Sequence, residues 1–225
     1  MRAVSQIAAV APQSLDEIVT DGSISLPNAP GTPRRVLALN QIKSIVPLSN
    51  TQPIFAVVKI PEKTFSKCLP AESGNRILIC EDIQDPGNIG TLIRSAAAFG
   101  FSGVVMSDQC ADPFAPKAVQ SSAGSILSLW IRRSADYMAI VDELVADKWS
   151  LVATDLAGSP NTSWTCAEKL MIALGNEGIG ISPELRRKAR DLFRIPMHAE
   201  NVESLNVAMS GAICMFLAAR SASNP

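Results

Sequence analysis

The chain has 225 residues, of which 47% are hydrophobic and 18% are charged. At roughly 150 residues per domain, this length predicts one full domain and a small second one. The composition excludes a disordered, collagen-like or coiled-coil chain. Twenty Lys and Arg residues against 21 Asp and Glu residues leave a formal charge of −1, so any attraction for polyanions must come from local patches.

Cysteine usage and hydropathy narrow the class further. The five cysteines are widely spaced and form no C-x-x-C pair, which indicates neither a disulfide framework nor a zinc site and favours a reducing compartment. The longest apolar stretch, residues 207–219, is too short to span a bilayer. The first eleven residues carry no targeting pattern, so we expect a cytoplasmic protein, or an organellar one if an upstream segment is missing.

The N-terminal third carries weak structural signals. Residues 26–33, LPNAPGTP, contain three prolines and a glycine and are expected to be irregular, with a loosely ordered segment before them. Apolar residues at helical spacing predict a helix over 36–46, and IFAVV at 54–58 predicts a buried strand. One helix and one strand do not make a domain.

From residue 76 the pattern alternates between strand and helix, which predicts a mostly parallel α/β sheet. The expected strands are 76–81, 103–106, 149–154, 169–174 and 192–195, and the expected helices are 88–99, 116–122, 137–147, 182–190 and 204–220. The last helix is apolar almost all round, which predicts burial against its own sheet and against something else, for which a partner chain is a natural candidate.

The first polar motif is DIQDPGNIGTLIRSA, residues 82–96, between a strand and a helix. Ligands of open α/β sheets bind at the carboxyl ends of strands, where Gly87 and Gly90 would let the backbone approach a ligand closely. Asn88 is a candidate helix cap, and Arg94 lies about a turn and a half inside the helix. The alternative is an ordinary turn followed by a solvated arginine.

Two further motifs follow later strands. Residues 174–180, LGNEGIG, place Glu177 in a glycine-rich loop that lacks the spacing of a dinucleotide fingerprint; the alternative is a flexible connection with a solvated carboxylate. Residues 195–208 place Ser204 and Asn206 at the start of the last helix, where a buried amide would need hydrogen-bond partners. His198, the one histidine, is expected in an exposed loop, and no nucleophile elbow precedes any serine.

Together the three motifs resemble those of the SpoU (TrmH-like) RNA ribose methyltransferases of the SPOUT superfamily. DIQDPGNIGTLIRSAAAFG resembles the first family motif, LGNEGIGIS the second, and IPM with ESLNVAMSGAI the third, so the resemblance covers roughly residues 76–220. It implies an α/β knot with a mostly parallel sheet and helices on both faces, a homodimer formed through the C-terminal helix region, and no metal.

The resemblance also implies S-adenosylmethionine as cofactor and methyl transfer to a ribose 2′-hydroxyl of RNA, most simply ribosomal RNA. The implied catalytic residues are Asn88, Arg94, Glu177, Ser204 and Asn206. The implied cofactor-binding residues are Leu174, Gly175, Asn176, Gly178, Ile195, Met197, Ser204 and Leu205. Because a guanidinium keeps its proton, we expect Arg94 to bind a phosphate and stabilise the developing alkoxide, with the phosphate or solvent taking the proton.

The sequence departs from the family pattern in three regions. Six residues separate Met197 from Ser204 where five are usual, residues 36–60 resemble only the last helix and strand of an L30e-like domain, and the Pro-rich start is unlike the family. We therefore expect residues 1–72 to hold a Pro-rich start and a remnant of an L30e-like substrate-binding domain, and residues 73–225 to form the methyltransferase domain. The alternatives are a tRNA ribose methyltransferase, a catalytically silent RNA-binding or dimerising protein of the same fold, or another α/β protein with a nucleotide cofactor.

Overall fold

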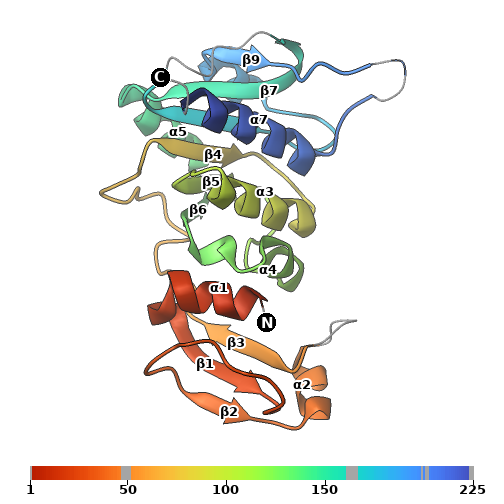
Figure 1. Cartoon of the computed structure of the whole chain (residues 1–225). Helices are drawn as coiled ribbons and strands as arrows, with labels where there is room; N and C mark the ends of the chain where they lie inside the picture. The colour runs from red at the N-terminus through yellow and green to blue at the C-terminus, as the bar shows by residue number, and fades with distance from the viewer. Residues whose placement is uncertain (1, 47–51, 161–166, 199, 201–202, 223–225) are drawn as a thin grey trace.

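The computed structural model describes residues 2–46, 52–160, 167–198, 200 and 203–222. These residues form two sheets, a three-stranded one with the order β2-β1-β3 and a six-stranded one with the order β6-β5-β4-β8-β7-β9. Figure 1 shows the small sheet at one end of the molecule and the large sheet at the other. Four of the five cysteines are described and carry free thiols, whereas Cys166 lies outside the described residues.

The N-terminal unit is ordered from its start, so the expectation of a loosely ordered segment before residue 26 is wrong. Its elements are α1 (Arg2–Val10), a short 3-10 turn (Pro12–Ser14), β1 (Leu15–Thr20), β2 (Arg34–Val36), α2 (Leu39–Ile45) and β3 (Ile54–Val58). Val4, Ile7 and Ala8 of α1 recur at helical spacing and are buried with Ile18 of β1. The Pro-rich segment is irregular, as predicted, and connects β1 to its parallel neighbour β2.

The large sheet is parallel throughout its described strands. They are β4 (Arg76–Cys80), β5 (Gly103–Ser107), β6 (Trp130–Ser134), β7 (Ser150–Ser159), β8 (Leu170–Leu174) and β9 (Asp191–Phe193). Side chains alternate between two cores, as the period of a strand requires. Leu78 and Cys80 of β4 enter one core, and Ile77 and Ile79 enter the other.

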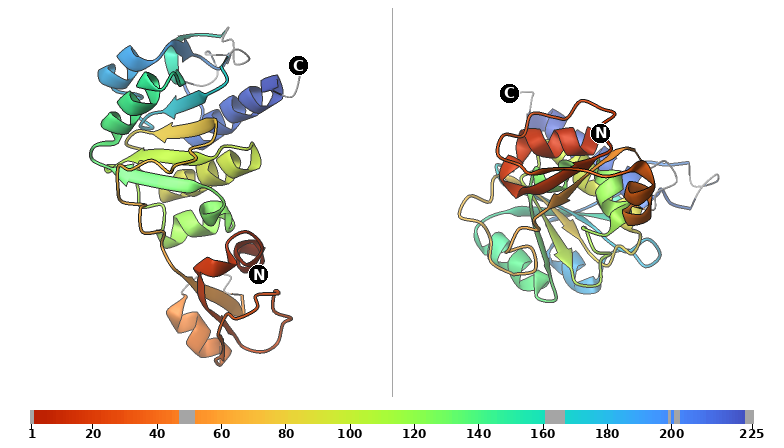
Figure 2. Two further views of the ribbon diagram at one scale, coloured as in Figure 1. Left: turned by 90° about the vertical axis from the view of Figure 1, so that its left-hand side faces the viewer. Right: turned by 90° about the horizontal axis from the view of Figure 1, so that it is seen from below.

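Helices cover both faces of this sheet, as predicted (Figure 2). They are α3 (Pro86–Ala98), α4 (Pro116–Ser122), α5 (Tyr137–Ala146), α6 (Pro183–Lys188) and α7 (Val207–Ala222). Helices α3 and α7 lie together on one face and pack closely at Gly211, where a Cβ would come within 2.3 Å of Leu92. Helix α5 covers the opposite face through Ile140, Val141 and Leu144.

The predicted strands and helices of this unit are confirmed within a few residues, with three differences. Strand β7 continues to Ser159, beyond the end of the predicted strand 149–154. Strand β6 was not predicted, because Arg132 and Arg133 interrupt its apolar pattern; Arg132 is nevertheless buried, and its guanidinium donates to the carbonyls of Cys68 and Ile131. The last helix begins at Val207 rather than 204. No helix in the described ranges is long and apolar enough to cross a membrane. The knotted path of the chain stays a prediction.

Candidate functional site

The first motif forms the turn from β4 into α3, and its cap is Asp85 rather than Asn88. The Asp85 carboxylate accepts hydrogen bonds from the backbone N–H groups of Gly87 (2.6 Å) and Asn88 (3.0 Å). It also forms an ion pair with Lys117 (2.7 Å). The contact with Lys117 is the main reason that the pKa of Asp85 is lowered. The predicted cap was wrong because Pro86 occupies the first helical position, which puts the cap one residue before it. The Asn88 side chain is thereby left for other contacts.

The two glycines of this motif are needed for packing. A Cβ on Gly90 would lie 2.1 Å from the Ala118 carbonyl oxygen of α4, and one on Gly87 would lie 2.7 Å from the Asp85 carboxylate. Gly90 therefore allows α3 to lie against α4, and Gly87 leaves room for the Asp85 cap. Close approach of this backbone to a ligand stays a prediction.

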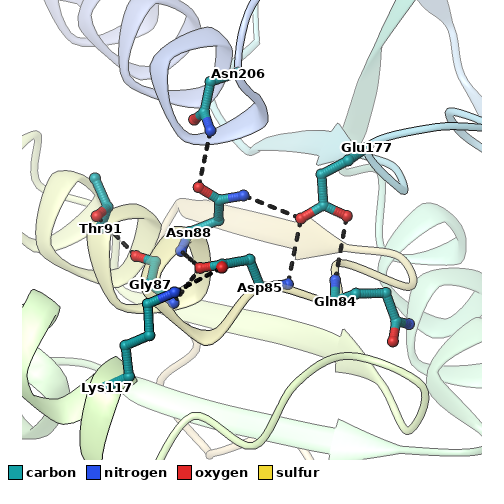
Figure 3. Close-up of polar contacts among 8 residues, drawn as sticks. All are labelled: Gln84, Asp85, Gly87, Asn88, Thr91, Lys117, Glu177 and Asn206. Carbon is teal, nitrogen blue, oxygen red and sulfur yellow. Dashed lines mark hydrogen bonds and ion pairs between the residues drawn. The ribbon is translucent and has the colours of Figure 1, made fainter.

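Glu177 connects the second motif to the first (Figure 3). Its carboxylate accepts hydrogen bonds from Asn88 Nδ2 (3.0 Å) and from the backbone N–H groups of Gln84 (3.2 Å) and Asp85 (3.4 Å). Burial is the largest single influence and raises the pKa of Glu177, but the hydrogen bonds together outweigh it and lower the pKa. Glu177 is therefore a fixed carboxylate, and the alternative of a freely solvated one does not hold.

Asn206 joins the third motif to the same group. Its Nδ2 donates to Asn88 Oδ1 at 3.0 Å, while its Oδ1 accepts from the backbone N–H groups of Ala208 (2.8 Å) and Met209 (3.3 Å). Asn206 thus caps α7 and reaches the start of α3 at once (Figure 3). One chain of hydrogen bonds, Asn206–Asn88–Glu177, connects three segments that lie far apart in the sequence.

The loop over residues 175–181 is closed on itself. Asn176 and Gly180 exchange two backbone hydrogen bonds of 3.0 Å, and the Asn176 side chain accepts from the Gly178 N–H (2.8 Å) and donates to the Asp82 carbonyl (2.8 Å). A Cβ on Gly175 would lie 2.2 Å from Gly180 and 2.4 Å from Ile181 backbone atoms, so this position admits no side chain. The loop has a defined shape and is not a flexible connection.

A cleft of about 720 Å³ opens at the carboxyl ends of β8 and β9 and beside the middle of β7; we call it the edge cleft. All eight predicted cofactor-binding residues line it, together with Glu177 and Asn206. Its wall also includes residues that were not predicted: Thr154, Asp155, Leu156, Ile179, Gly180, Ile181, Arg186, Phe193, Arg194, Glu203, Val207 and Ser210. Thr154 ends the predicted strand 149–154, which lies next to β8, and Asp155 and Leu156 come directly after it, so adjacency in the sheet was the signal that could have found them.

The remaining predicted residues lie apart from the hydrogen-bonded group. Ser204 is exposed and lines the edge cleft, while His198 is exposed as predicted. Arg94 is exposed and does not line the edge cleft; it lines a larger cleft of about 1930 Å³ between α3, α4 and the N-terminal unit, which we call the N-terminal cleft.

Residues 199, 201 and 202 of the lengthened loop lie outside the described residues. Within the described ranges, no cluster of His, Cys, Asp and Glu could hold a metal ion.

Residues 75–216 match the model of the SpoU rRNA Methylase family. The chain belongs to this family. Among curated relatives, the SpoU protein described here is 31% identical over 182 residues to the 23S rRNA (guanosine(2553)-2′-O)-methyltransferase RlmP of Bacillus subtilis (strain 168), covering 80% of this chain and 70% of RlmP. It spans from 26% to 52% of the length of three other curated relatives.

Solved structures share the arrangement of both sheets. The SpoU methyltransferase AviRb from Streptomyces viridochromogenes, in complex with AdoMet, superimposes with a TM-score of 0.82 at 25% identity and covers 100% of this chain and 90% of AviRb. The AdoMet-bound rRNA methyltransferase from Sinorhizobium meliloti gives a TM-score of 0.79 at 26% identity, covering 97% and 85%. The matches include the N-terminal unit, so this unit is part of the shared architecture.

Proposed function

We propose that this SpoU protein transfers the methyl group of S-adenosylmethionine to a ribose 2′-hydroxyl of ribosomal RNA. The observation that carries the proposal is the hydrogen-bonded chain Asn206–Asn88–Glu177 at the rim of a cleft that all eight expected cofactor-binding residues line. Three separate motifs converge there because the carboxyl ends of parallel strands share one edge of the sheet.

The edge cleft fits a cofactor with an apolar base, a polar ribose and a charged amino-acid tail. Leu156, Ile179 and Leu205 are large apolar side chains that lie exposed on its wall, where they would cover an adenine ring. The backbone groups of the 175–181 loop, together with Ser204, would hold the polar atoms. When bound, the cofactor supplies an activated methyl group on a sulfonium, so the protein needs to contribute position rather than a strong nucleophile.

Residues of this chain orient the ribose hydroxyl that accepts the methyl group. Glu177 and Asn206 fix the Asn88 amide by accepting from its nitrogen and donating to its oxygen, so its direction is set before substrate arrives. Arg94 lies in the next cleft, exposed and without an ion pair among the described residues. We infer that Arg94 binds the phosphate next to the target ribose and stabilises the alkoxide as the hydroxyl proton leaves to that phosphate or to solvent.

Ribosomal RNA is the favoured substrate because RlmP and the Sinorhizobium meliloti protein are named for it. The test is transfer of a tritiated methyl group from S-adenosylmethionine to unmodified ribosomal RNA and, in parallel, to unmodified transfer RNA. Incorporation into ribosomal RNA with a product resistant to alkaline cleavage at one position is expected. Incorporation into transfer RNA alone would contradict the substrate, and binding of the cofactor without any transfer would favour a silent member of the fold.

We also propose that the protein works as a homodimer through α7. Met209 and Phe216 of α7 are 59% and 47% exposed, and Phe216 contacts Phe99 with ring centroids 5.9 Å apart, which makes an apolar surface beside α3. Sedimentation equilibrium is expected to give twice the mass of the chain. The double substitution M209E/F216E is expected to give a monomer, and a monomeric wild-type protein would contradict the proposal.

A further inference from the structure

One buried carboxylate, that of Glu81, is used by none of the contacts described so far. Glu81 follows the last residue of β4 and is 4% exposed. Such a group is stable in the interior only when hydrogen bonds replace its hydration. Glu81 Oε2 accepts the backbone N–H of Ser182 at 2.6 Å, and Oε1 accepts the hydroxyl of Tyr137 at the start of α5.

These contacts place Glu81 at both ends of the 175–181 loop. At the entry, the backbone N–H of Glu81 donates to the carbonyl of Leu174 at 2.9 Å, one residue before Gly175. At the exit, its carboxylate holds Ser182, which caps α6 by accepting from the Leu185 N–H. A third contact comes from the next residue, because the Asp82 carbonyl accepts from the Asn176 side chain at 2.8 Å.

The hydroxyl groups of Ser107 and Tyr137 hold Asp82 and Glu81 in place. Asp82 has a φ of 56°, a left-handed conformation that non-glycine residues adopt at a cost, and its backbone N–H and carboxylate both bond to the Ser107 hydroxyl. Burial, followed by the hydrogen bond to Glu81, raises the pKa of Tyr137, so its hydroxyl keeps the proton that it donates. Glu81 and Asp82 are thus held by Ser107 of β5 and Tyr137 of α5.

We infer that Glu81 is a positioning residue that sets the shape of the cofactor loop, with Tyr137 fixing its carboxylate. The inference rests on the proposed function in so far as the loop binds S-adenosylmethionine. Glu81 does not line the edge cleft, so it acts through the loop and not by touching the cofactor.

The test compares Glu81→Ala with Glu81→Gln. Alanine removes both acceptors and leaves the Ser182 N–H and the Tyr137 hydroxyl unpaired, whereas glutamine keeps an oxygen for Ser182 and offers an NH₂ group to the oxygen of Tyr137. Titration with S-adenosylhomocysteine is expected to show binding weakened roughly 10- to 100-fold in E81A and by less than about threefold in E81Q. In methyl transfer, the KM for S-adenosylmethionine is expected to rise in E81A while the KM for RNA stays unchanged.

A matched control separates this role from general stability. Ile131 of β6 is buried in the other core of the large sheet, to which no residue of the 175–181 loop belongs, so Ile131→Ala or Ile131→Val, whichever matches the Tm loss of E81A, is expected to bind S-adenosylhomocysteine as the wild type does. Equal weakening in the control, wild-type affinity in E81A, or E81Q as weak as E81A would each overturn the inference.

A ligand-free measurement distinguishes failure of this inference from failure of the proposed function. Hydrogen exchange followed by NMR is expected to show the Ser182 amide protected in the wild type and at least tenfold less protected in E81A, with the amides of α3 unchanged. If the wild-type protein bound no S-adenosylhomocysteine, the proposed function would fail. The exchange data would still test the contact between Glu81 and the Ser182 amide. If Ser182 exchanged equally in both proteins, the positioning role would fail by itself.

Discussion

Helix α3 separates two clefts of different character. At its N-terminus, Asn88 enters the edge cleft's hydrogen-bonded group, in which a carboxylate and two amides satisfy one another. In its second half, Arg94 lines the N-terminal cleft; among the described residues of its wall there is no Asp or Glu, and Arg2 is the other charged residue. Under the proposed function, the two clefts divide the work along one helix: the first would hold the small cofactor, and the second would offer its two arginines to an anionic ligand.

Removing the centre of the pre-organised group is expected to have the largest effect. Glu177→Ala leaves the backbone N–H groups of Gln84 and Asp85 and the Asn88 amide without their shared acceptor, so Asn88 loses its fixed direction. We expect kcat to fall roughly 100-fold or more, measured by tritium transfer, with a circular dichroism spectrum like that of the wild type. Glu184→Ala, at an exposed position of α6, is the control and is expected to stay near wild-type rate. Turnover within threefold of wild type would show that the group is structural.

Arg94→Lys tests the other side of α3. Lysine keeps the charge but loses the forked geometry that fits a phosphate, so kcat is expected to drop by on the order of 10- to 100-fold. Because Arg94 does not line the edge cleft, the affinity for S-adenosylhomocysteine should be unchanged in calorimetric titration. If Arg94→Lys kept full turnover, Arg94 would not act in the reaction through its forked geometry. If it bound S-adenosylhomocysteine more weakly, the two clefts would not have separate roles.

The next prediction concerns the shape of the edge cleft itself. Gly175→Ala would force a Cβ to within 2.4 Å of the backbone at Gly180 and Ile181, so the loop must move. We expect S-adenosylhomocysteine to bind roughly tenfold more weakly or worse. Gly103→Ala on β5, whose Cβ would meet the Trp130 ring at 2.0 Å outside the edge cleft, is the matched control and is expected to bind within about twofold of wild type. Similar losses in both would mean that lost stability, and not the shape of the loop at Gly175, sets the affinity.

The two clefts also differ in how far the sequence revealed them. The motifs that contribute to the edge cleft resemble those of a known family, and the eight residues that this resemblance implied for cofactor binding all line the cleft. What the sequence did not reveal was which groups bond to each other: Asp85 rather than Asn88 caps α3, and Gly90 packs against α4. Such pairings depend on backbone geometry that a motif does not specify.

The N-terminal cleft could not be foreseen, because its walls come from short elements with weak signals. Helix α1 is nine residues long and α2 is seven, and both contribute to the wall of this cleft. Their stability comes from packing: Leu127 of the large unit joins the small core around Ile18, which no local periodicity indicates. Strand β6 was missed for a related reason, since the carbonyl oxygens that make a buried Arg132 acceptable are supplied by the fold.

The smallest expected effect is the dependence of stability on the charge of Glu177. Its pKa is lowered from 4.5 in the folded protein, so between the folded and unfolded values the unfolded chain binds the proton more readily and stability rises with pH. The stabilisation is therefore fully present above about pH 5 and is lost as the pH falls through the folded pKa. We expect the Tm of wild type minus that of Glu177→Gln to be greatest near neutral pH and to shrink toward pH 3. The difference should be small, because Glu177 is exposed to solvent on the rim of the cleft, where water screens its charge. A difference that grew on acidification would mean that burial outweighs the three N–H donors and that Glu177 is held as a neutral acid.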